Sequence, residues 1–101
     1  MAILTDAEAA DILNYGSIEE MPSRVMTILI PAVDGFLANA TGKDWGANDP
    51  IDAVAKAAAG MLLARWFEYA GEVGSASGIG VIGLIAQLKS KYEQELAADT
   101  A

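Results

Sequence analysis

Apolar residues recur at helical spacing along most of this chain, and the pattern predicts four helices. Apolar residues that return every three or four positions lie on one face of a helix. This spacing predicts helices at about 6–15, 22–41, 50–70 and 81–97, and it leaves a Gly- and Ser-rich stretch at 71–80 that we expect to be a flexible loop. No stretch shows the alternation of a half-buried strand. The fold class is therefore predicted to be all-α, a small bundle of three main helices plus a short N-terminal helix, with no sheet.

The same spacing assigns an apolar face to three of these helices, and such a face is expected to pack toward the core. In the helix at 22–41 it consists of Val25, Ile28, Leu29, Ala32, Val33, Phe36, Leu37 and Ala40. In the last helix it consists of Val81, Leu84, Ile85, Leu88, Tyr92 and Leu96. In the first helix, the expected buried side is Ile12 and Leu13.

Local signals set the helix ends. Thr5 and Glu8 have the spacing of a capping box, in which each side chain satisfies a backbone N–H of the other residue. Gly42 is expected to end the second helix. Asp49 followed by Pro50 predicts the start of the third, with Asp as the N-cap and Pro at the first helical position.

Pro31 lies inside the second helix, where it has no N–H to donate and its ring crowds the preceding turn. Two outcomes are possible: a kink at Pro31, or a loosely wound first segment that leads into a regular helix. Because the apolar face continues through Pro31, we favour the kink.

The predicted helix at 50–70 has apolar residues on all sides of its middle. Asp52 and Lys56 lie on one side near its start, whereas Arg65 and Glu68 lie nearly opposite near its end. A helix that is apolar all round is a buried helix. A chain of 101 residues has the length of one domain and buries only a modest fraction of its surface alone. We therefore expect neighbouring subunits to cover part of this helix.

Composition excludes most kinds of chemistry. The chain is 53% hydrophobic, and six Lys and Arg against fourteen Asp and Glu give a net charge of −8. Such a charge disfavours nucleic-acid binding, which depends on cations that displace counterions. Without Cys or His, the chain has no disulfide, no thiolate metal site and no imidazole base. We predict no enzyme activity, catalytic residue, cofactor or metal.

Targeting signals and membrane-spanning segments are also not expected. The N-terminal residues have no basic region like that of a secretory signal. The longest apolar stretch near the C-terminus, Ile79 to Leu88, is too short to span a bilayer. We therefore predict a soluble, intracellular protein when it is made.

Two motifs imitate binding sites. Gly78, Gly80 and Gly83 match the dinucleotide fingerprint GxGxxG, but that site needs a preceding strand, and none is predicted. The run Arg65–Tyr69 sets aromatics beside a cation, yet consecutive helical residues point in different directions and cannot form one stacking platform. Core packing plus a contact with another subunit is the expected role. Trp45 lies in a turn, where it can pack on its own core or insert into a neighbour.

The run Ala40–Trp45, followed by the Pro50-led alanine-rich helix that ends in Arg65–Tyr69, resembles the head-tail connector (adaptor) family of tailed bacteriophages. The sequence ILIPAV and the closing helix after a loop are also similar to that family. The resemblance covers nearly the whole chain. It implies a structural virion protein at the head-tail junction, made in the host cytoplasm, with no membrane association.

The resemblance further implies a ring of identical subunits, commonly a dodecamer, that binds under the portal protein and docks tail or tail-completion proteins. Genomic DNA passes through the ring without sequence-specific binding. For the interface between subunits the candidate residues are Lys43, Trp45, Arg65, Trp66 and Tyr69. The alternative function is a small acidic helical binding module, such as a phage-encoded regulator that occupies a basic site on a host protein.

Overall fold

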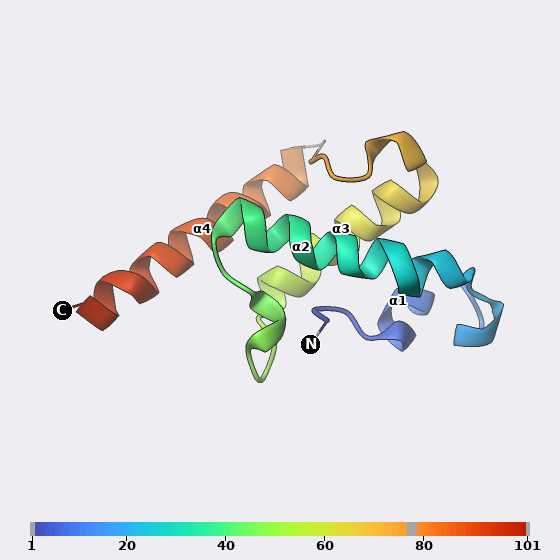
Figure 1. Ribbon diagram of the computed structural model, residues 1–101, viewed down its shortest axis with the longest axis horizontal. Helices are drawn as coiled ribbons and strands as arrows, with labels where there is room; N and C mark the ends of the chain where they lie inside the picture. The colour runs from blue at the N-terminus through green and yellow to red at the C-terminus, as the bar shows by residue number, and fades with distance from the viewer. Residues whose placement is uncertain (1, 77–78, 101) are drawn as a thin grey trace.

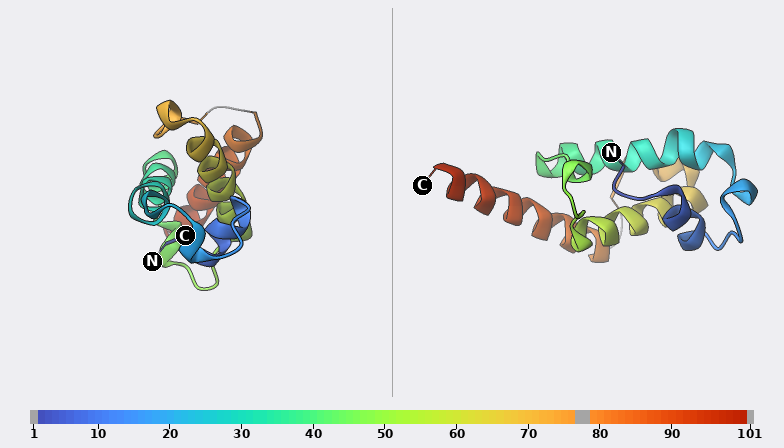
Figure 2. Two further views of the ribbon diagram at one scale, coloured as in Figure 1. Left: turned by 90° about the vertical axis from the view of Figure 1, so that its right-hand side faces the viewer. Right: turned by 90° about the horizontal axis from the view of Figure 1, so that it is seen from below.

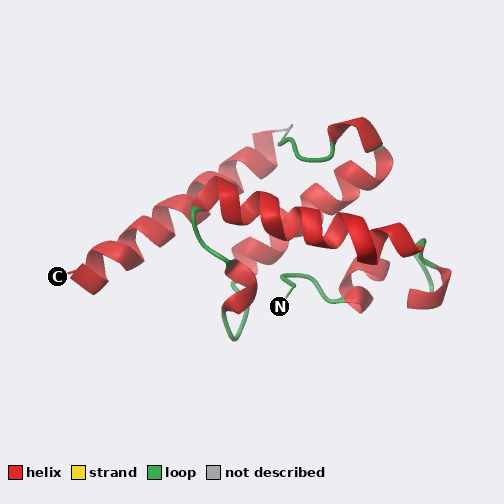
Figure 3. Ribbon diagram, viewed as in Figure 1, coloured by secondary structure: helices red, strands yellow, loops and turns green. Residues whose placement is uncertain are grey.

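The computed structural model describes residues 2–76 and 79–100, which form helices, turns and loops (Figure 1). In chain order the elements are α1 (Asp6–Ile12), the 3₁₀ turn η1 (Ile18–Glu20), the π-helical turn η2 (Val25–Leu29), α2 (Ile30–Thr41), the 3₁₀ turn η3 (Trp45–Ala47), α3 (Ala53–Glu68), the 3₁₀ turn η4 (Ala70–Glu72) and α4 (Ile79–Thr100). The described residues contain no strand (Figure 3). The all-α prediction is confirmed.

The middle of the fold is occupied by α3, which contacts α1, α2, α4, η2 and η4. Its buried residues have the three-and-four spacing of one helix face and are Ala55, Ala58, Ala59, Leu62, Leu63 and Trp66. Met61 is the one large apolar side chain of α3 that is exposed. The prediction that α3 is buried on all sides is therefore wrong, because Ala53, Ala57 and Met61 are exposed on the side opposite the buried face. The expectation that neighbouring subunits cover part of α3 stays a prediction, and this exposed side is the part left for them to cover.

At its start, α3 is capped by Asp52 and not by Asp49, which corrects the predicted boundary. One carboxylate oxygen of Asp52 accepts hydrogen bonds from the N–H groups of Val54, at 2.8 Å, and Ala55, at 3.3 Å. The other oxygen pairs with Lys91 of α4, whose ammonium lowers the pKa of Asp52. Asp52 thus combines two stabilising contacts, whereas Asp49 precedes the helix.

Around Pro31, the less favoured of the two predicted outcomes is found. The chain winds as a π-helical turn, η2, in which the N–H of Ile30 bonds the carbonyl of Val25, and regular α2 follows. The wider winding breaks the three-and-four spacing of the apolar face. Ile28, which was assigned to the buried face, is consequently 59% exposed.

The longest helix, α4, extends beyond the rest of the molecule at its C-terminal end (Figure 2). Val81 and Leu88 are buried against the body, and Tyr92 is partly buried. Leu96 was also predicted to lie on the buried face, but it is 45% exposed. The molecule is accordingly elongated, with extents of 49 × 27 × 18 Å.

Between α3 and α4, the described part of the predicted flexible loop is held by hydrogen bonds. The backbone N–H and the hydroxyl of Ser75 both donate to the carbonyl of Glu72, at 3.0 and 2.7 Å. Ala76 packs against the core. Residues 77 and 78 of the predicted loop lie outside the described residues. Residues 70–72 form the turn η4, and the flexibility of the loop stays a prediction.

The N-terminal segment is held between two helices through both backbone groups of the buried residue Ile3. Its N–H donates to a carboxylate oxygen of Asp34 on α2, at 3.1 Å, and its carbonyl accepts from the Lys56 ammonium on α3, also at 3.1 Å. Lys56 also pairs with Glu8, at 2.7 Å, and Glu8 forms the predicted capping box with Thr5. Asp34 and Lys56 thus fix the start of the chain to the helical body.

Asp34 makes the stability of this clamp depend on pH. Burial of its carboxyl raises the pKa of Asp34 above its ordinary value of 3.8. The unfolded chain gives up this proton at lower pH than the folded chain does. Ionisation of Asp34 therefore reduces the free energy of unfolding as the pH rises from the ordinary pKa through the raised pKa.

The variant Asp34→Asn keeps an oxygen acceptor for the Ile3 N–H but cannot ionise. We expect its free energy of unfolding to increase relative to that of the wild type between about pH 3 and pH 7. Urea unfolding of both proteins across this range measures the difference. A difference that is constant with pH, or that shrinks as the pH rises, contradicts the expectation.

Candidate assembly surfaces

Trp45 is part of the chain's own core. Its side chain is 1% exposed, and its indole N–H donates to the hydroxyl of Thr41 at 2.8 Å. That hydroxyl in turn donates to the carbonyl of Leu37 at 2.7 Å. Of the two roles left open for Trp45, the structure has the internal one. Trp45 was an interface candidate, but its side chain is buried and hydrogen-bonded within the subunit and does not lie on the surface.

Lys43 connects the same turn to α4. Its ammonium lies 2.6 Å from the carboxylate of Glu95 and 4.5 Å from the centre of the Trp45 ring. Gly42 ends α2 with a φ of 89°, as predicted, and a Cβ at this position would lie 3.3 Å from the ring of Tyr92. The turn thus packs closely on α4, and the charge of Lys43 is paired inside the subunit.

Trp66 is also internal. Its side chain is 0% exposed, its N–H donates to the carbonyl of Ser75 at 2.8 Å, and its ring meets Phe36 edge-to-face with centroids 5.5 Å apart. Trp66 joins α3 to α2 and to the chain segment before α4. Trp66 was also an interface candidate, but like Trp45 it is buried within the subunit and does not lie on the surface.

Arg65 and Tyr69 are the two candidates that face solvent. The Arg65 guanidinium lies 4.5 Å from the centre of the Tyr69 ring and bonds the carboxylate of Glu72 at 3.0 Å. Tyr69 is 45% exposed. An exposed aromatic ring held against a guanidinium is a surface of the kind enriched at interface centres. This Arg65–Tyr69 pair is the part of the sequence-predicted site that can contact another protein.

Two uncharged faces were not recognised from the sequence. The outer face of α2 and η2 is formed by exposed residues without charge, namely Thr27, Ile28, Pro31, Gly35 and Asn39. Between Arg24 and Lys43 the sequence has a single charge, Asp34, and that carboxylate binds the Ile3 N–H. The scarcity of charge along this stretch was the available signal. The sequence did not show which residues of this stretch face outward, because that depends on the π-helical turn η2.

The second uncharged face belongs to the first half of α4. Ile82, Gly83 and Ala86 are exposed there, and the sequence from residue 79 to 88 contains no charge. We call these two surfaces the α2 face and the α4 face. Each face has one large exposed apolar side chain, Ile28 or Ile82, which another molecule could cover.

A small pocket lies beside α1. It has a volume of about 340 Å³ and is lined by Ala7, Ala10, Asp11, Tyr15, Gly16, Ser17 and Ile18. The turn that forms one wall is fixed by the N–H of Gly16, which donates to the carboxylate of Glu20 at 3.1 Å. This volume is at the lower end for small-molecule sites and suits a single side chain. No pattern in the sequence indicated a pocket here.

The charges of the subunit are arranged so that its surface is acidic. Lys43, Lys56, Arg65 and Lys91 are all in ion pairs within the chain. A fifth basic residue, Arg24, lies 5.0 Å from the centre of the Phe67 ring. Most of the fourteen acidic residues have no ion pair within the described residues, so the net charge of −8 is displayed to solvent.

The described residues contain no group of acidic side chains placed to hold a metal ion. None of the helices among them has both the length and the apolar character needed to cross a membrane. Of the GxGxxG glycines, Gly80 and Gly83 lie within α4, and Gly78 is outside the described residues. Comparison of the chain with protein-family models, curated proteins and solved structures found no match.

The hydroxyl of Thr41 is expected to control the stability of the Trp45 turn. In the variant Thr41→Val the buried indole N–H has no acceptor, which costs about 1–3 kcal/mol of unfolding free energy. Thr41→Ser keeps the hydroxyl and is the matched control. Urea unfolding followed by tryptophan fluorescence compares the two variants. If Thr41→Val is as stable as Thr41→Ser, the hydrogen bond does not have this role.

Proposed function

We propose that this protein is a head-tail connector (adaptor) subunit of a tailed bacteriophage. In this proposal identical subunits form a ring, commonly a dodecamer, under the portal protein. The ring continues the DNA channel and docks tail or tail-completion proteins, without a chemical step. The sequence resemblance, which extends over nearly the whole chain, motivates the proposal. The observation that carries it is the presence of separate uncharged faces on an otherwise acidic subunit.

A closed ring needs two different, mutually complementary surfaces on each subunit. The α2 face and the α4 face lie on different helices, and the exposed Arg65–Tyr69 pair adds an aromatic contact at the end of α3. A single uncharged patch would instead suit a symmetric dimer. The presence of several distinct surfaces therefore supports a ring more than it supports a dimer.

The acidic surface supports the same function. Double-stranded DNA is bound mainly by cations that neutralise its phosphates. Four of the six basic side chains are in ion pairs within the subunit, while many acids face solvent. A channel wall built from such subunits repels the DNA backbone and lets the genome pass.

The projecting end of α4 supports contact with a second component. Its last turns extend past the helical body (Figure 1), so they are accessible to a partner above or below the ring. Portal and tail proteins are the partners in this proposal. An extended element of this kind allows one subunit to contact its ring neighbours and a different protein at once.

The proposal is tested by mixing the purified protein with the portal protein of the same phage. We expect a ring on the portal in electron micrographs and a matching particle mass. A protein that stays monomeric and never joins the portal overturns the proposal.

Tyr69 provides a sharper test of the interface. Tyr69→Ala removes an exposed ring, so the unfolding free energy should stay within about 0.5 kcal/mol of that of the wild type. We expect the protein concentration at half-assembly to rise about tenfold or more. Tyr69→Phe keeps the ring over Arg65 and should assemble nearly as the wild type does. Equal assembly of all three proteins removes Tyr69 from the interface.

The acidic surface also favours a second function, a small binding module that occupies a basic site on a host protein. Many acids of the subunit are left without an internal ion pair, and the described residues contain no metal-binding group. A pull-down from host lysate distinguishes the two functions. Recovery of one host protein in stoichiometric amount, with no virion protein, favours the binding module.

A further inference from the structure

The pocket beside α1 combines an apolar wall with a negative charge. Ala7, Ala10 and Ile18 contribute apolar surface, and Asp11 contributes a carboxylate. No ion pair involving Asp11 occurs within residues 2–76 and 79–100. The carboxylate of Glu20 lies at the edge of the pocket, where it accepts the Gly16 N–H. The pocket therefore offers carboxylate oxygens next to an apolar surface.

The side chain that complements such a pocket has an aliphatic stem and a cationic end. Lys and Arg bury their methylene groups along apolar surface and keep the charged group at a polar site. A carboxylate next to the cation favours the bound state, and more so where the contact excludes water. A neutral or acidic side chain has no such partner in this pocket.

One basic residue of the chain is available for this contact. Within the described residues Lys89 has neither an ion pair nor a ring contact, whereas the other five bases have one or the other. Lys89 is exposed on α4, on the same side of the helix as Ile82 and Ala86 of the α4 face. This side thus presents an apolar surface followed by a cation.

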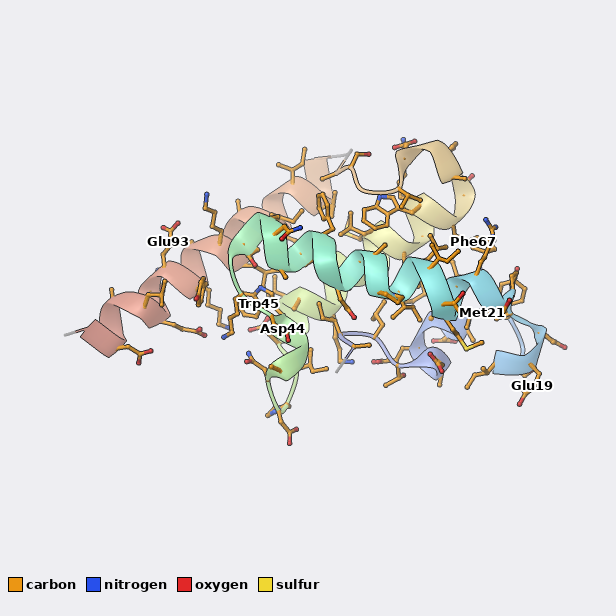
Figure 4. All side chains as sticks on the ribbon, in the orientation of Figure 1. Glu19, Met21, Asp44, Trp45, Phe67 and Glu93 are labelled. Carbon is orange, nitrogen blue, oxygen red and sulfur yellow. The ribbon has the colours of Figure 1, made fainter. Side chains whose placement is uncertain are left out.

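The pocket and this side of α4 lie toward opposite ends of the molecule. In Figure 4, Glu19, which is next to Ile18 at the pocket, is labelled at one end of the long axis. Glu93, one helical turn after Lys89, is labelled toward the other end. A contact between Lys89 and the pocket therefore joins two subunits in a head-to-tail manner.

We propose that Lys89 of one subunit inserts into the α1 pocket of the next and pairs with Asp11, while Ile82 and Ala86 pack over Ile18 at the pocket rim. The partner is a second copy of this chain. This inference rests on the proposed function, since it names one contact of the ring. The two surfaces differ and complement each other, as a head-to-tail ring requires.

Charge reversal at each side tests this contact. We expect Asp11→Lys and Lys89→Glu each to raise the concentration at half-assembly on the portal about tenfold or more. The double variant has the cation in the pocket and the carboxylate on α4, so the two can pair again. It should assemble almost as the wild type does. An equimolar mixture of the two single variants should also assemble, because alternating subunits place opposite charges at every contact.

Asp49→Lys is the matched control for Asp11→Lys, because it makes the same charge change at an exposed position before α3, outside the pocket and the proposed contact surfaces. It should assemble as the wild type does. Thermal unfolding of each variant establishes that it is folded. High salt should weaken wild-type assembly more than it weakens assembly of the Lys89→Ala variant, because salt screens the pair.

The outcomes separate this inference from the proposed function. If the wild type forms no ring with the portal, the proposed function fails. If all variants form rings equally, the function stands and the Lys89–Asp11 contact is wrong. If Asp11→Lys blocks attachment to the portal but Lys89→Glu has no effect, the pocket receives a portal side chain, and the second-copy assignment is overturned.

Discussion

Close packing of one face of α3 against the other helices is the constraint on which the rest of this structure depends. The contacts are close because small residues face them. A Cβ at Gly60 would lie 3.3 Å from the end of Ile12 on α1, and a Cβ at Gly80 of α4 would lie 2.8 Å from the end of Met61. A larger residue at Gly80 therefore requires Met61 to move. Both tryptophans are buried in this packing, so the surface is formed by other residues.

Ion pairs between distant parts of the chain complete this arrangement. Lys43 with Glu95, Lys56 with Glu8, and Lys91 with Asp52 each join elements far apart in sequence. Partly exposed pairs of this kind contribute little stability each. Their main effect is on the surface, because they use basic side chains inside the subunit and leave acids outside. The net charge of −8 itself follows from composition, and the pairs leave few basic side chains free on the surface.

The surfaces that remain for assembly are the ones the bundle does not cover. They are the α2 face, the α4 face, the Arg65–Tyr69 pair and the α1 pocket. They offer three kinds of chemistry: two are uncharged, one is aromatic and cationic, and one is acidic. A subunit with several unlike surfaces can form head-to-tail contacts and still bind a further component.

The helical class, the Thr5–Glu8 capping box and the end of α2 at Gly42 follow from the sequence alone. These features depend on residues close together in the chain or on the period of the apolar pattern. The tertiary structure alone decided the cap at Asp52, because Lys91 reaches it from α4. It also decided the outward position of Ile28, the exposure of Leu96 and the internal roles of Trp45 and Trp66. Those outcomes depend on which distant segments meet, and spacing along one helix carries no information about its neighbours.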